Sequence, residues 1–78
     1  MEQLRLGVYR HFKNKKYYRV HGTAKHSETM EDFVLYEPLY KGSPAKFWVR
    51  PLAMFVEDVE WEGKKQPRFL YVGEMVPV

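Results

Sequence analysis

Histidine, serine and carboxylate side chains are the groups of this sequence that could perform acid–base chemistry. His26, Ser27 and Glu28 are consecutive, and they are the residue types of hydrolytic sites. However, neighbouring side chains point in different directions, whereas a working triad is assembled from distant positions. Turn capping by Ser27 and solvation of Glu28 explain the same residues. A hydrolase with His26 as base, Glu28 as its orienting group or acid, and Arg50 for charge stabilisation is therefore kept as an alternative.

A metal site is a second possibility for the same residue types. His11, His21 and His26, together with Glu28, could ligate a metal, and a histidine two residues before a glutamate is the spacing found in zinc deaminases. That signature also requires two cysteines, and the sequence contains none. His11 and His21 are expected on paired strands, where a cross-strand contact explains them equally well. We predict no metal and no cofactor.

Tyr9 and His11 are the residues whose spacing favours binding. They share one face of an expected strand, opposite Val8 and Phe12, and polar aromatic side chains exposed together can stack on a base or hold a peptide. This face is expected to be exposed, with the core on the side of Val8 and Phe12.

Two arginines could complete such a site. If Arg50 and Arg68 converge on it, their guanidinium groups can bind a carboxylate or a phosphate, and Trp48 or Tyr36 would form an apolar wall. In the alternative interpretation both arginines form structural ion pairs with Glu28, Glu31 or Glu57.

The leading hypothesis is a non-enzymatic binding module for an anionic small molecule, a nucleotide or a peptide. Its pocket is expected to be lined by Tyr9, His11, His26, Glu28, Arg50 and Arg68. A protein-interaction domain that pairs through a sheet edge, as a monomer or weak homodimer, is a further alternative. Nucleic-acid binding through a basic groove ranks below it.

Short strands must position these residues. Alternating apolar residues predict strands over 6–12 and 18–24, and Asn14 is expected to take the left-handed conformation in the turn between them. Further strands are expected over 33–40 and 47–50. Pro51 should begin a helical turn that becomes a strand near Val56, and 62–65 should form a turn before a last hairpin strand over 69–72.

The predicted fold class is mostly β, a small antiparallel SH3-like barrel or half-barrel of five to six strands with one short helical turn, since closure removes exposed edges. Large rings should fill its core: Tyr18, Trp48, Phe55 and Phe69. The 78 residues are one domain, compact over 5–72, with a loose tail over 73–78.

Composition limits the classes of binding partner and the cellular compartment that we expect for this protein. The net charge of +3 is a modest excess, too small to indicate nucleic-acid binding by itself, and the basic groups near 13–19 and 64–68 are mainly expected to be solvated. Without cysteine or a long apolar segment, we expect a cytoplasmic protein that does not contact membranes.

Five short motifs, in one order, resemble the small bacterial DUF1653 family. They are Gly-Val-Tyr-Arg-His-Phe at 7–12, His-Ser-Glu-Thr at 26–29, Trp-Val-Arg-Pro at 48–51, Met-Phe at 54–55 and Pro-Arg-Phe at 67–69. The family usually has glycine where Asn14 stands, and a left-handed turn accepts either residue. The resemblance implies a compact domain and supplies no activity.

Overall fold

The structure, a computed structural model, describes residues 4–76 and confirms a mostly β chain with antiparallel strands and one short helix. The helix, α1, covers Leu52–Phe55. The strands are β1 Gly7–His11, β2 Tyr17–Lys25, β3 Asp32–Pro38, β4 Trp48–Pro51, β5 Asp58–Trp61, β6 Lys64–Pro67 and β7 Phe69–Gly73. α1 is too short to cross a bilayer, and the described residues contain no other helix that could.

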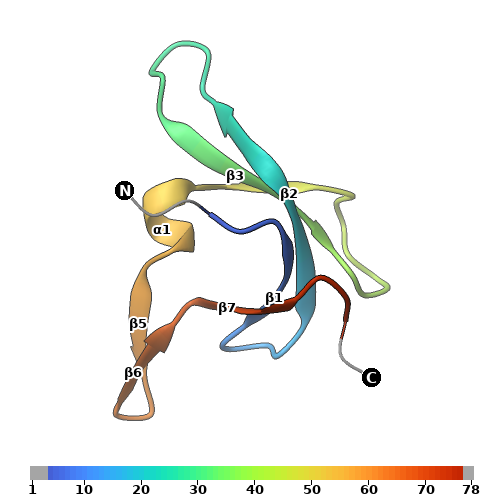
Figure 1. The fold of residues 1–78 in the computed structure, drawn as a ribbon, viewed down its shortest axis with the longest axis vertical. Helices are drawn as coiled ribbons and strands as arrows, with labels where there is room; N and C mark the ends of the chain where they lie inside the picture. The colour runs from blue at the N-terminus through green and yellow to red at the C-terminus, as the bar shows by residue number, and fades with distance from the viewer. Residues whose placement is uncertain (1–3, 77–78) are drawn as a thin grey trace.

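Five strands form one antiparallel sheet in the order β4-β3-β2-β1-β7, while β5 and β6 form a separate hairpin. In Figure 1 the β2–β3 hairpin projects at one end of the molecule and the β5–β6 hairpin at the other, with α1 between β4 and β5. Within residues 4–76 the edge strands β4 and β7 do not pair with each other. The described chain is thus an open sheet, and no closed barrel is found.

Residues 4–76 form seven strands, more than the predicted five to six, because the turn predicted over 62–65 occupies only two residues. Glu62 and Gly63 have φ of 53° and 78°, the left-handed pair that a two-residue hairpin turn requires. β6 therefore begins at once at Lys64 and pairs with β5. The expected hairpin partner over 69–72 instead pairs with β1, so that His11 lies opposite Phe69.

The predicted hairpin between the first two strands is confirmed, with Gly7 opposite Val20. The left-handed residue of its turn is Lys15, with φ of 62°, and the prediction for Asn14 is wrong. The Asn14 Oδ1 atom accepts a hydrogen bond of 2.8 Å from the Lys16 backbone N–H, a side-chain mimic of a turn that places the left-handed position one residue later.

β1 carries buried residues on both faces: Val8, on the predicted core face, is 0% exposed, and the face that was predicted to be exposed also belongs to the core. Tyr9 is only 7% exposed, whereas Leu6 on the predicted core face is 60% exposed. Tyr9 can be buried because its hydroxyl donates a hydrogen bond of 2.8 Å to the Arg5 carbonyl. The buried cluster consists of Tyr9, Tyr18, Val20, Val34, Tyr36, Phe55 and Phe69.

Trp48 does not belong to this core. It is 38% exposed because it lies on β4, the strand at the sheet edge. The predicted tail is held at its start, since Gly73 pairs with Val8 and Arg19 donates a hydrogen bond of 3.2 Å to the Glu74 carbonyl. The end of the predicted tail, 77–78, lies outside the described residues.

Candidate functional site

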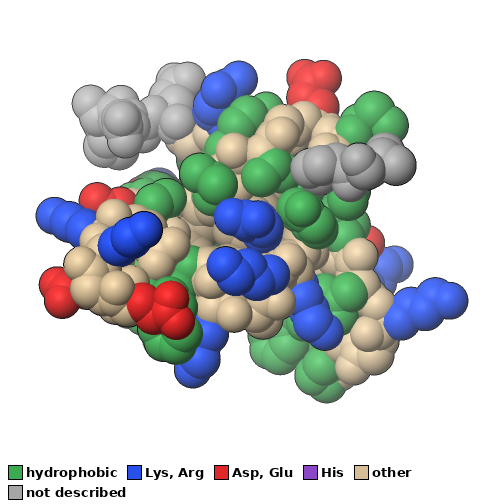
Figure 2. All heavy atoms as spheres, turned by 90° about the horizontal axis from the view of Figure 1, so that it is seen from below, with side chains coloured by type: hydrophobic (Ala, Val, Ile, Leu, Met, Phe, Trp, Pro, Cys, Tyr) green, Lys and Arg blue, Asp and Glu red, His purple; other side chains and the backbone are tan. Residues whose placement is uncertain are grey.

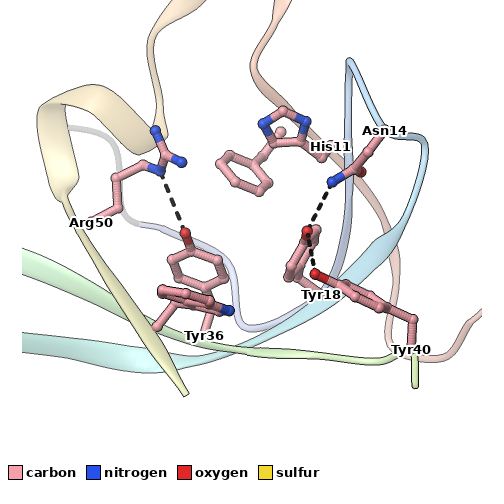
Figure 3. A pocket seen from close by; sticks show the side chains of 8 residues that line it. His11, Asn14, Tyr18, Tyr36, Tyr40 and Arg50 are labelled. Carbon is pink, nitrogen blue, oxygen red and sulfur yellow. Dashed lines mark hydrogen bonds between the residues drawn. The ribbon is translucent and has the colours of Figure 1, made fainter. Parts of the chain in front are cut away.

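A pocket of about 250 Å³ opens beside the aromatic core (Figure 3). Its side chains come from β1, β2, β3, β4 and β7 and from the loops that follow β1 and β3. The lining residues are His11, Asn14, Tyr18, Tyr36, Tyr40, Trp48, Arg50 and Phe69. Most of the sheet therefore contributes to this one pocket.

Rings of the buried cluster support the pocket from the core side. Tyr18 and Tyr36 meet the ring of Phe69 edge to face, with centroids 5.8 and 5.6 Å away. All three residues are buried, with exposed fractions of 5–6%, so their rotamers are held by packing. The wall that they form is in place before any ligand binds.

Three polar side chains form a chain of hydrogen bonds along one side of the pocket. The Asn14 Nδ2 atom donates to the Tyr18 hydroxyl at 3.0 Å, and that hydroxyl donates to the Tyr40 hydroxyl at 3.4 Å. Burial, followed by the bond to Tyr40, raises the pKa of Tyr18 to about 12. Tyr18 is therefore a neutral phenol at physiological pH.

His11 lies beside Tyr18 as a neutral ring, with the two ring centroids 6.4 Å apart (Figure 3). Burial lowers its pKa, and the charges of Arg50, Arg68 and Lys13 lower it further. Its Nδ1 atom accepts a hydrogen bond of 3.2 Å from the Lys13 backbone N–H. The proton of the neutral ring is therefore on Nε2, which makes that nitrogen a donor.

Arg50 brings the positive charge of the pocket. Its Nε atom is 3.5 Å from the Tyr36 hydroxyl, a long hydrogen bond, and its guanidinium carbon lies 5.6 Å from the centre of the Phe69 ring. No carboxylate lines the pocket, and none of the three ion pairs in residues 4–76 uses Arg50. The pocket is thus suited to an anion.

The structure brings two of the six predicted site residues into this pocket, His11 and Arg50. Tyr9 does not line it, and the expectation that Tyr9 is exposed is wrong, because its ring packs in the core against Phe55. Arg68 forms an ion pair of 2.8 Å with Glu57, so the structural alternative holds for this arginine. Its charge nevertheless acts on the pKa of His11.

His26 and Glu28 lie at the exposed turn of the β2–β3 hairpin, and neither lines the pocket. The His26 Nδ1 atom accepts hydrogen bonds from the backbone N–H groups of Glu28, at 3.1 Å, and of Thr29, at 3.3 Å. His26 therefore stabilises its own turn. The structure does not unite His26, Glu28 and Arg50, the three groups of the hydrolase alternative, in one pocket.

The predicted cross-strand pairing of His11 with His21 is not observed. The His21 Nε2 atom contacts the Glu37 carboxylate at 2.8 Å, while His11 faces Phe69 across the β1–β7 ladder. Among residues 4–76, no three histidines or carboxylates gather as metal ligands would.

Comparison with known proteins places these observations in a family. Residues 7–71 match the family model described as "Protein of unknown function (DUF1653)". The chain belongs to the DUF1653 family. It is similar, with 38% identity and a TM-score of 0.92, to the crystal structure of a DUF1653 protein from Bordetella bronchiseptica, over 100% of this chain and 99% of that one. No curated protein matches the sequence.

Some lining residues of this DUF1653 domain were not predicted. Tyr18 and Phe69 were assigned to the core alone, whereas they serve both core and pocket. Asn14 and Tyr40 lie in loops and are brought together only by the fold. One signal could have indicated the contact between Asn14 and Tyr18: the two residues are four positions apart across a hairpin turn.

Proposed function

We propose that this DUF1653 protein is a binding module that holds the anionic group of a small molecule, a nucleotide or a peptide beside Arg50. The observation that carries this proposal is a guanidinium group in a pocket to which no carboxylate among residues 4–76 contributes. Arginine presents a planar set of donors that suits carboxylate and phosphate groups. The neutral His11 ring and the Tyr36 hydroxyl add donors that carry no charge of their own at neutral pH.

The dimensions of the pocket limit the ligand. Its volume of about 250 Å³ is slightly below the roughly 300–1,000 Å³ of sites for drug-sized molecules. An anionic group with one small ring, or one side chain of a peptide, fits this volume. The partly exposed Trp48 ring supplies a flat wall for a planar part of the ligand.

A hydrolase is less well supported by the same geometry. No carboxylate of the described residues lines the pocket to orient His11 or accept a proton, and the His11 Nδ1 atom is occupied by a backbone N–H. His26 and Glu28 would have to act at an exposed hairpin turn. A binding role uses the groups that are present without further partners.

An interaction domain is the second candidate, because β4 is a sheet edge and Phe47, Trp48 and Val49 are exposed along it. An extended partner strand could add to such an edge. Sedimentation equilibrium over a wide concentration range tests self-association by this route.

We also propose that the architecture is an SH3-like half-barrel and that the protein is cytoplasmic. Support for the first comes from five antiparallel strands that share one aromatic cluster. Support for the second comes from a sequence without cysteine, which suits a reducing compartment.

The test is a titration followed by nuclear magnetic resonance, at constant ionic strength, with adenosine monophosphate and N-acetylaspartate as probes. Arg50→Gln removes the charge and should weaken binding about tenfold or more, since hydrogen bonds to charged groups contribute about 1.5–3 kcal/mol. Arg19→Gln is the matched control, because Arg19 lies on β2 and does not line the pocket. Equal weakening by both variants, or shifts that do not saturate, would contradict the proposal.

A further inference from the structure

We propose that Arg10, Lys15 and Gln66 form a second binding site, on the opposite face of β1, for a phosphate group that carries a small apolar substituent. A cavity of about 150 Å³ lies there, lined by Arg10, Phe12, Lys15, Gln66, Pro67 and Leu70. It shares no lining residue with the Arg50 pocket, so the inference does not depend on the proposed function.

Arg10 is the residue that points to a ligand. It is held between two neighbours in the sheet, opposite Tyr17 of β2 and Leu70 of β7. Its Nε atom is buried and has no hydrogen-bond partner among residues 4–76, and none of the ion pairs in that range involves it. Buried donors in native proteins are almost always satisfied. Arg10 also lines the adjacent cavity, where an oxyanion can accept hydrogen bonds from the accessible part of its guanidinium group.

Lys15 adds a second positive charge to the cavity. The β1–β2 turn fixes its position, because the Lys15 N–H donates a hydrogen bond of 3.0 Å to the His11 carbonyl. Gln66, on β6, contributes an uncharged amide. The described part of the chain gives this cavity two cations and no carboxylate, which matches the charge of about −1.5 to −2 on a phosphate monoester.

Apolar side chains form the rest of the lining and indicate that the phosphate is attached to an organic group. Leu70 is 44% exposed, and Phe12 is braced by Trp61, whose ring meets it edge to face at 5.6 Å. A small ring attached to the phosphate can pack against Phe12, Pro67 and Leu70. Free phosphate would leave these apolar side chains exposed to water.

The surrounding charge favours the same ligand. The β1–β2 turn and the β5–β6 hairpin lie on the lower side of the molecule in Figure 1. In Figure 2, which views that side, Lys and Arg side chains lie both near the middle and around the edges, whereas the Asp and Glu side chains lie away from the middle. Such a field attracts anions to this face.

The experiment uses phenyl phosphate and inorganic phosphate as probes, with sodium chloride at matched ionic strength as the salt control. Chemical shifts of backbone amides and of the Arg10 Nε–H group are followed in the full chain. We expect saturable shifts at Arg10, Lys15 and Leu70, and binding of phenyl phosphate several-fold tighter than binding of inorganic phosphate. Equal affinities would contradict the proposed apolar substituent and would leave a site for free phosphate alone.

Variants separate this site from the Arg50 pocket. Arg10→Gln should weaken binding about tenfold, and Lys15→Asn about threefold, whereas Arg50→Gln should change it less than twofold. Asparagine suits the left-handed backbone at position 15, so Lys15→Asn decides the question if Arg10→Gln does not fold. Shifts that sodium chloride reproduces, or affinities unchanged in folded variants of Arg10 and Lys15, would overturn the proposal.

Discussion

The ring of Phe69 lies parallel to the ring of Phe55, with centroids 4.1 Å apart and an interplanar angle of 6°. Phe69 begins β7 and lines the Arg50 pocket, whereas Phe55 ends α1 and is 1% exposed. This stack joins the helix to the sheet directly behind the pocket. Loss of either ring should affect stability and binding together.

Removal of the Phe55 ring is expected to destabilise the protein strongly. Phe55→Ala should lower the free energy of unfolding by about 3–5 kcal/mol, because burial is lost and a cavity remains, a large part of the roughly 5–15 kcal/mol of a typical domain. Val56→Ala, at an exposed neighbour, should change it by less than about 0.5 kcal/mol. Urea unfolding measures both, and similar effects would contradict the assigned core.

Gly7 is expected to tolerate no side chain. It has φ of 137°, and a Cβ atom there would lie 2.7 Å from the Gly73 carbonyl oxygen on β7. Gly7→Ala should therefore destabilise the domain by about 2–4 kcal/mol, from backbone strain and overpacking combined.

Gly22 is the control for this prediction. It also has positive φ, at 154°, but a Cβ atom there would meet nothing within 4 Å. Gly22→Ala should be at least about 1 kcal/mol milder in thermal or urea unfolding, because it lacks the overpacking contribution. Equal losses would show that β7 can move away from β1.

His11 should make stability depend on pH in the acidic range. Its pKa in the folded protein lies below the ordinary value of 6.5, so the unfolded chain binds this proton more readily. Stability should therefore fall as pH decreases from 6.5 toward the folded pKa, and its full value should be present above 6.5.

The comparison of wild type with His11→Gln tests this dependence. From about pH 7.5 to about pH 5.5, a span that covers the ordinary titration of histidine, wild type should lose more free energy of unfolding than the variant. Identical losses would show that another group dominates. An NMR titration of the His11 ring should give a pKa below 6.5.

Tyr18 should make stability depend on pH in the alkaline range, where stability falls as pH rises, the reverse of the dependence on His11. Its pKa is raised from 10.0 to about 12, so the folded protein retains this proton more strongly than the unfolded chain. Stability should fall as pH rises from 10 to about 12. Wild type should lose more stability there than Tyr18→Phe, and phenolate absorbance should show one tyrosine that ionises late.

Local patterns predicted much of this fold, and their failures have physical causes. Alternation over 18–24 correctly placed Tyr18 and Val20 in the core. The pattern works there because β2 lies in the middle of the sheet and has one solvent-exposed face and one buried face. Alternation over 6–12 predicted only one of the two buried faces of β1, because Val8 and Tyr9 are both buried. A tyrosine that hydrogen-bonds to a nearby carbonyl does not reveal its burial by its residue type.

Long-range relationships were the least predictable part. The pairing of β1 with β7 and the approach of Asn14 to Tyr18 and Tyr40 depend on the complete fold. The convergence of Arg50 and Arg68 on His11 was an assumption that strand parity could not establish, and of these two arginines Arg50 lines the pocket with His11. The inclusion of His26 and Glu28 required knowledge of where their hairpin ends, which spacing along the chain does not contain.

The position of β1 between β2 and β7 also has a consequence for synthesis on the ribosome. β1 can form its hairpin with β2 early, but His11 meets Phe69 only after nearly the whole described chain has emerged. Until then, Tyr9 lacks the cover of both Phe55 and Tyr71. A nascent chain therefore keeps much of its aromatic surface open to chaperones, and both candidate sites, each lined by a β7 residue, are completed late in translation.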